Sequence, residues 1–278
     1  MAEFRQRQVE NAVAGVRQRY APQALLGGSE FAPRAALPHV STGFAGLDAM
    51  TGCGGAPLGM LTLISGRSTL GKLTLAYKVL ANAQRSATHP GAAHNVGLID
   101  LSRTADPEYV ARCGVDLEYL LVGRPALGPK AVTMIGDLVQ SRGLRALVVD
   151  SLSDLAADKQ ALRAFNAALP RLQQVARRSG CALLVLDEPH APWLRWFNLD
   201  ASNLTRWAAA LHLEMQREQW LRQGGELIGY RAQTRLLKSR WVYGIRSAPL
   251  EVIFHGTAPC LSPNLTPQSH TSPPHRGA

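Results

Sequence analysis

Gly66-Arg67-Ser68-Thr69-Leu70-Gly71-Lys72-Leu73-Thr74 is the stretch of this chain that decides its fold. Its glycines and lysine have the spacing of a phosphate-binding loop, G-x-x-x-x-G-K-S/T, whose backbone N–H groups cradle phosphates and whose lysine reaches the outer ones. The next residue normally offers a hydroxyl to Mg²⁺, but here it is Leu73. Thr74 lies about 100° further round the expected helix and does not simply replace that hydroxyl. The stretch therefore predicts nucleotide binding, with inefficient hydrolysis.

Apolar runs and helical patterns alternate around this loop. Residues 60–65 predict a strand leading into it, and residues 72–85 predict a helix after it, which is the context that the motif requires. Further buried strands are predicted at 96–101, 146–150 and 182–186, helices at 129–142 and 159–179, and alternating strands at 208–215, 232–239 and 250–254. This order predicts an α/β fold with a mostly parallel central sheet flanked by helices, extended by the last strands in a more antiparallel manner.

The two ends of the chain differ from this core. Valines near helical spacing predict a short amphipathic helix at 5–20, and Gly and Pro predict a loose linker at 21–40. The end of the chain is rich in Pro, Ser, Thr and His and is expected to be disordered. We expect an N-terminal helix and linker at 1–39, a core at 40–256 and a disordered tail at 257–278.

The composition indicates the compartment and the class of partner. No apolar run is long enough to cross a bilayer and the N-terminus is polar, so we expect a cytoplasmic protein without membrane contact. The four cysteines lack metal-ligand or disulfide spacing and are expected to be buried thiols. The net charge of +10 favours a polyanion such as nucleic acid. The basic run at 231–246 fits that partner or, alternatively, a solvated strand face.

Asp150 ends an apolar strand well after the glycine loop. In nucleotide hydrolases an aspartate at this place holds Mg²⁺ or its water, whereas a helix cap or turn is the simpler role for an aspartate after a strand. Together with Lys72 on a strand, loop and helix unit, Asp150 favours the nucleotide interpretation and is the candidate metal ligand. Ser151 follows it and is a candidate to orient the same water.

The chain resembles the RecA recombinase family over most of its length. The matching segments, in order, are Val40-Ser41-Thr42-Gly43, Leu47-Asp48, Gly54-Gly55-Ala56-Pro57-Leu58-Gly59-Met60, Leu98-Ile99-Asp100, Asp106-Pro107-Glu108-Tyr109, Gly114-Val115-Asp116 and Val148-Val149-Asp150-Ser151. The resemblance implies a RecA-like P-loop core that binds ATP. It also implies that Tyr109 stacks on adenine, against the alternative of an ordinary half-buried helix tyrosine. Leu236-Leu237-Lys238-Ser239-Arg240 is similar to a basic strand that reaches the neighbouring subunit's nucleotide, which makes Lys238 and Arg240 candidate contacts in trans.

Three catalytic features of the family pattern are replaced together. Ser102 stands where the family has its catalytic glutamate, and a serine lacks the basicity to activate water. Leu73 replaces the magnesium-binding hydroxyl, and Leu186-Asp187-Glu188-Pro189 replaces the segment with the glutamine that senses the γ-phosphate. Nothing in the sequence positions Asp187 or Glu188 as a substitute base. No residue is therefore assigned as catalytic, and whether Mg²⁺ is required stays open.

The DNA-contacting segments of the family are altered as well. The segment between Asp150 and the helix at 159–179 is too short for the family's first DNA-binding loop. The second is replaced by residues 190–197, which include Trp193, Arg195, Trp196 and Phe197. Aromatic rings and guanidinium groups suit single-stranded nucleic acid, and they suit a protein interface equally well. These residues and Arg206 are candidate contacts to DNA or to a partner.

The resemblance also implies partners and a role. The N-terminal helix is similar to the segment by which RecA subunits dock, so it would bind the chain itself or a RecA recombinase. Short, degenerate relatives include ImuA-like proteins of translesion cassettes, which implies an error-prone DNA polymerase as a further partner. We interpret the chain as an ATP-binding accessory protein in DNA repair, recombination or damage-induced mutagenesis. The alternatives are an active DNA-dependent ATPase recombinase on single-stranded DNA, and a nucleotide-free interaction module.

Overall fold

The computed structural model describes residues 2–20, 37–67, 69–86, 94–188 and 202–253. It forms two compact units, Met1–Leu37 and Pro38–Ala278. The first holds helix α1 (Ala2–Tyr20), which begins three residues before the expected helix at 5–20 and exposes Phe4, Val9 and Tyr20. Most of the predicted linker and all of the predicted tail lie outside the described residues.

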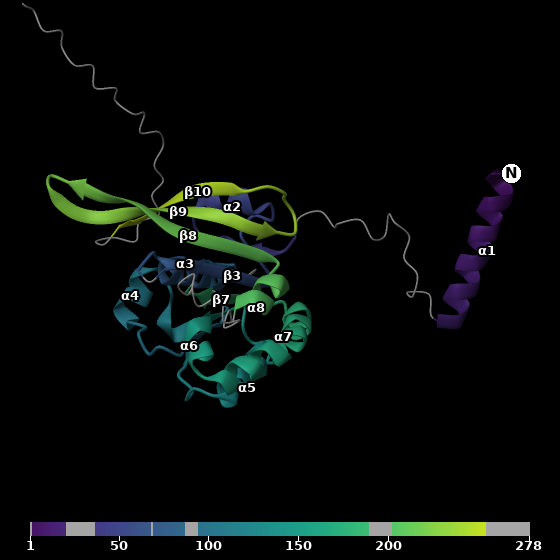
Figure 1. Cartoon of the computed structure of the whole chain (residues 1–278), viewed down its shortest axis with the longest axis horizontal. Coiled ribbons are helices and arrows are strands. Elements are labelled where there is room, and N and C mark those ends of the chain that lie inside the picture. The colour runs from purple at the N-terminus through teal and green to yellow at the C-terminus, as the bar shows by residue number, and fades with distance from the viewer. Residues whose placement is uncertain (1, 21–36, 68, 87–93, 189–201, 254–278) are drawn as a thin grey trace, which may run out of the picture. The chain divides into compact units, whose positions relative to one another are not determined.

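A central sheet of eight strands organises the second unit (Figure 1). Its strands, in spatial order, are β10 (Arg246–Ile253), β9 (Glu226–Ser239), β8 (Leu211–Gln223), β3 (Leu61–Gly66), β7 (Ala182–Asp187), β6 (Ala146–Asp150), β4 (Val96–Asp100) and β5 (Leu120–Gly123). From β8 to β5 all neighbours are parallel, whereas β9 and β10 are antiparallel to their neighbours. The predicted α/β fold with a mostly parallel sheet is confirmed.

Helices cover both faces of this sheet. One group consists of α2 (Ala45–Thr51), α3 (Lys72–Arg85) and α4 (Pro107–Arg112), and the other of α5 (Pro129–Gln140), α6 (Leu152–Ala157), α7 (Lys159–Ser179) and α8 (Ser202–Ala208). Successive residues of a strand pack on opposite faces of the sheet, because side chains alternate along a strand. In β6, Val148 packs in the cluster with α3, while Leu147 and Val149 pack with α5 and α7. A small two-stranded sheet, β1 (His39–Val40) with β2 (Ala56–Pro57), and the 3₁₀ turn Leu117–Tyr119 complete the described elements.

The C-terminal strands differ most from the prediction. The strand expected at 208–215 begins only at Leu211, because Ala208 closes helix α8, and it continues to Gln223. Strand β9 begins at Glu226 rather than 232, so the two strands form one long hairpin that projects beyond the helices (Figure 1). Gly224 and Gly225, both with positive φ, form its two-residue turn. Strand β10 likewise starts at Arg246 instead of 250, and Phe254 lies outside the described residues.

The cysteines that the structure describes are buried. Cys53, Cys113 and Cys181 are buried free thiols, as expected, and Cys260 lies outside the described residues. Within the described ranges, none of the helices combines the length and the apolar character that crossing a bilayer requires.

Candidate functional site

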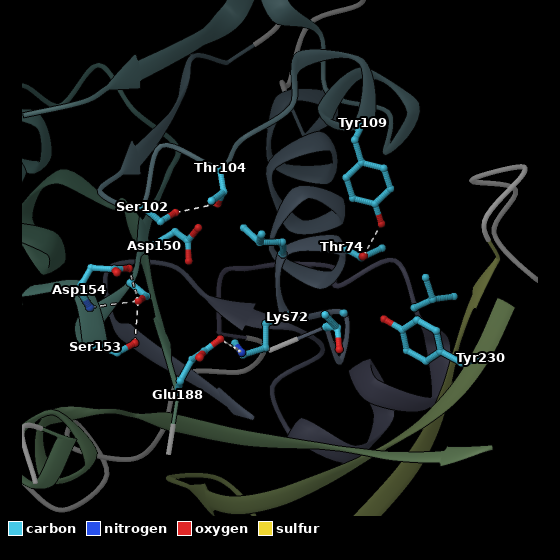
Figure 2. Close-up of a pocket in the computed structure, with 15 residues that line it drawn as sticks. Lys72, Thr74, Ser102, Thr104, Tyr109, Asp150, Ser153, Asp154, Glu188 and Tyr230 are labelled. Carbon is cyan, nitrogen blue, oxygen red and sulfur yellow. Dashed lines mark hydrogen bonds and ion pairs between the residues drawn. The ribbon is translucent and has the colours of Figure 1, made fainter. Parts of the chain in front are cut away.

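A pocket of about 580 Å³ lies at the carboxyl ends of the parallel strands, where open α/β sheets bind ligands. Its walls come from the start of α3, the segments after β4, β6 and β7, and strands β9 and β10. In Figure 2, Asp150, Asp154 and Glu188 lie on one side of the pocket, and Tyr109 and Tyr230 lie on the other. The pocket thus has an acidic side and an aromatic side, with Lys72 between them.

The glycine loop forms the floor of this pocket. Gly71 has a φ of 87°, and a Cβ at this position would lie 2.8 Å from the Tyr230 hydroxyl, so only glycine fits. Gly71 is also the N-cap of α3 and offers no side-chain cap, which leaves the first backbone N–H groups of the helix for a ligand. Of the predicted loop residues, the structure places Thr69, Gly71, Lys72, Leu73 and Thr74 on the pocket wall, Gly66 and Leu70 beneath it in the core, and Ser68 outside the described residues.

Lys72 is buried and makes three hydrogen bonds through its ammonium group. It donates to the carbonyl oxygens of Gly66 and Arg67 at 2.6 and 2.8 Å, and to the Glu188 carboxylate at 3.1 Å. The sequence offered no means of positioning Glu188, and the structure places it on the pocket in an ion pair with Lys72 (Figure 2).

Asp150 ends β6 and lines the same pocket, and its side chain is nearly buried. Burial, followed by the nearby charges of Asp154 and Asp100, raises the pKa of Asp150 to about 6, although Lys72 opposes the shift. Ser151 is the N-cap of α6: its hydroxyl donates to the Asp154 carboxylate at 2.6 Å and accepts from the Asp154 amide. The Ser151 hydroxyl is therefore used to cap α6. This helix occupies the short segment between Asp150 and the helix at 159–179, where the family has its first DNA-binding loop.

The raised pKa of Asp150 predicts a pH-dependent gain in stability for Asp150→Asn. The folded state binds a proton more tightly than the unfolded chain, so the charged carboxylate destabilises the fold above pH 6, and this penalty disappears as the pH falls towards 4. We expect the variant to be more stable by about 2 kcal/mol at pH 7.5 and to match the wild type near pH 4, measured by urea unfolding. The exposed Asp137→Asn is the control, and an equal gain at both pH values would contradict the assignment.

The aromatic side of the pocket contains Tyr109 and the threonine that follows Leu73. The hydroxyls of Thr74 and Tyr109 lie 2.5 Å apart, so Thr74 is engaged with α4 (Figure 2). The Tyr109 ring is half-buried, packs edge-on against Tyr77 at 6.2 Å and has the Arg112 guanidinium 5.8 Å from its centroid. Tyr109 therefore lies on the pocket wall, where both of its predicted roles still apply.

Ser102 lies at the acidic edge and is bonded to its own segment. Its hydroxyl lies 2.7 Å from that of Thr104 and donates to Asp100 at 3.3 Å. Asp100 is fully buried and is paired with the Arg124 guanidinium at 2.8 Å. The described carboxylates left on the pocket are Asp150, Asp154 and Glu188. Among the residues that the structure describes, no cluster of three or more acidic, histidine or cysteine side chains is arranged to hold a metal ion.

Of the remaining candidates, the described residues Arg206, Lys238 and Arg240 do not line this pocket. Lys238 donates to the Arg206 and Trp207 carbonyls at 2.9 and 2.8 Å, so it caps the C-terminus of α8. Burial lowers the pKa of Lys238, and Arg240 is exposed. Trp207, which the sequence interpretation did not single out, is 81% exposed beside Lys238. Trp193, Arg195, Trp196 and Phe197 lie outside the described residues.

Comparison with known proteins finds a matching family model and related sequences. The model of the RecA N-terminal domain matches residues 7–177. The protein named RecA of Pseudomonas fluorescens is 26% identical over 238 residues, covering 80% of this chain and 66% of that protein. The protein of the same name from Acidothermus cellulolyticus is 26% identical over 267 residues, covering 90% of this chain and 75% of its own length. The chain thus spans about two thirds of the length of the first curated relatives that it matches.

Proposed function

This chain belongs to the RecA family, and from that premise we propose that it is an ATP-binding accessory protein in DNA repair, recombination or damage-induced translesion mutagenesis, with weak or absent ATP hydrolysis. The observation that carries the proposal is that one pocket contains both groups suited to hold phosphates and residues unsuited to hydrolysis. Lys72 and the uncapped start of α3 would hold phosphates, and they share the pocket with Leu73 and Ser102, which by the resemblance replace the hydroxyl and the glutamate of the family pattern.

The residues present fit a nucleotide. The first turn of α3 is uncapped, Gly71 leaves no room for a side chain, and Lys72 brings a cation to the same end of the helix. In the proposed complex, Lys72 and the amides of residues 66–72 hold the phosphates. Asp150 holds any metal ion, and Tyr109 packs against the base. The nucleotide supplies the triphosphate, and this chain's contribution is to bind and orient it.

The same pocket gives little support for hydrolysis. A serine hydroxyl at 102 does not take a proton from water at neutral pH, and Leu73 offers no oxygen to a metal ion. Glu188 is the one described carboxylate in direct contact with Lys72, where it neutralises the cation. Hydrolysis by this chain is therefore slow or absent in the proposal.

The proposed partners follow from charge and exposed surface. The net charge of +10 favours single-stranded DNA, and the exposed apolar residues of α1 favour docking to a second copy or to a RecA recombinase. Lys238 and Arg240 would complete a site across such an interface. An error-prone DNA polymerase is the further partner of the translesion role.

A nucleotide-free interaction module is the second candidate. The ion pair between Lys72 and Glu188 favours it, because the lysine already has an anion within the chain. The two candidates predict opposite results for ligand binding.

Titration with a non-hydrolysable ATP analogue, with and without Mg²⁺, tests the proposal. We expect saturable binding and, in a separate assay with ATP and single-stranded DNA, phosphate release far below that of an authentic recombinase. If the analogue does not bind with or without Mg²⁺, the nucleotide-free interaction module is the function that remains. Turnover at the rate of a recombinase would identify an active enzyme. A protein that stays monomeric with ATP and single-stranded DNA would remove the role of Lys238 and Arg240.

A further inference from the structure

The ammonium group of Lys72 is fully occupied within the chain. A lysine has three N–H donors, and the Lys72 donors meet the carbonyls of Gly66 and Arg67 and the carboxylate of Glu188. The two carbonyls belong to the backbone of the loop itself. Glu188 directly follows β7, and the last residue of that strand, Asp187, pairs with Ser65 in β3. This register brings the Glu188 carboxylate to the loop (Figure 2). A phosphate oxygen that reaches Lys72 must therefore take the place of Glu188.

The charge around Lys72 makes this exchange costly for a highly charged ligand. Among the described residues that line the pocket, Lys72 is the only cation, and Asp150, Asp154 and Glu188 supply three carboxylates. Displacing Glu188 leaves its carboxylate beside the incoming phosphate, and like charges at short range repel. Because the Glu188 side chain is 43% exposed, water screens part of this repulsion, so the effect on affinity is moderate.

We propose that Glu188 competes with the outermost phosphate for the ammonium group of Lys72. The pocket would therefore bind a nucleoside diphosphate in preference to a triphosphate. This inference rests on the proposed nucleotide site. In phosphate-binding loops the backbone amides cradle the α- and β-phosphates and the lysine reaches the β- and γ-phosphates, so the γ-phosphate is the one that depends on the lysine. A diphosphate held by the amides at the start of α3 leaves the pair between Lys72 and Glu188 in place, whereas a triphosphate has to open it.

Glu188→Gln tests this inference on the full chain, because glutamine has the same shape and an oxygen for Lys72 but no charge. Unlabelled ADP and a non-hydrolysable ATP analogue each displace a fluorescent ADP, with and without Mg²⁺. We expect the wild type to bind ADP at least fivefold more tightly, and the variant to gain about fivefold for the ATP analogue with little change for ADP. Glu188→Ala should shift the ratio in the same direction, and Glu108→Gln, an exposed glutamate outside the pocket, should leave it unchanged.

The outcomes separate the inference from the function beneath it. If the wild type binds both nucleotides and neither Glu188 variant, folded by circular dichroism, changes their ratio, Glu188 is no competitor and the inference fails while the nucleotide site stands. If the wild type prefers the ATP analogue to ADP, the inference also fails while the nucleotide site stands. If the wild type and both variants bind neither nucleotide, the proposed function itself fails and the inference goes with it.

Discussion

Lys72→Ala should lower the affinity for an ATP analogue by about 100-fold, because hydrogen bonds from a charged donor contribute about 1.5–3 kcal/mol each. The affinity for ADP, which leaves the pair between Lys72 and Glu188 in place, should fall less. The loss has a second cause in this chain. Without the ammonium group, the Glu188 carboxylate stays in the pocket unpaired and repels the phosphates that the loop amides still attract. A fluorescent-nucleotide titration measures both affinities directly.

A second substitution separates the two causes. The double variant Lys72→Ala with Glu188→Gln lacks the unpaired carboxylate, so it should recover part of the lost affinity, about fivefold. Lys130→Ala removes an exposed lysine from α5 and should leave binding unchanged. If Lys72→Ala folds and its affinity for the ATP analogue is within about threefold of the wild-type affinity, Lys72 does not hold the phosphates and the proposed nucleotide site is wrong.

Some elements could be predicted closely because their sequence signals are local and strong. Helix α7 has the expected bounds, and both of its ends carry a cap: Asp158 accepts from the Gln160 amide, and Gly180 closes the helix with a φ of 71°. Strand β6 also matches, because a strand buried on both faces appears as one continuous apolar run. Helix α3 and strand β6 place Lys72 and Asp150 on one pocket.

The ion pair between Lys72 and Glu188 could not be predicted in the same way. The two residues are 116 positions apart, and they meet because β7 is inserted beside β3 in one particular register. Sheet order depends on the packing of the whole unit and leaves no local pattern. The length of the β8 and β9 hairpin was missed for a different reason. Its outer part has little buried surface to impose an apolar alternation, and the turn Gly224-Gly225 is the local signal that marks the hairpin.

Restoring two replaced groups should turn this chain into a measurable ATPase. Leu73→Ser supplies a hydroxyl at the first turn of α3, and Ser102→Glu supplies a carboxylate at the edge of the pocket that Asp150 lines. General-base catalysis typically contributes 10²–10⁴-fold, so we expect the double variant to release phosphate about 100-fold faster than the wild type in the presence of Mg²⁺. A coupled phosphate-release assay with single-stranded DNA measures the rate.

The added glutamate makes the metal ion indispensable, which gives the prediction a second readout. It would be the fourth carboxylate on a pocket with one described cation, so binding of ATP without Mg²⁺ should weaken while hydrolysis with Mg²⁺ rises. Leu73→Ser with Ser102→Gln has the same shape but no base, and it should stay as slow as the wild type. Adding Lys72→Ala to the active pair should abolish the gain. If the double variant binds ATP with Mg²⁺ yet gains nothing, these two positions do not explain the missing activity, and Glu188 at Lys72 becomes the next group to neutralise.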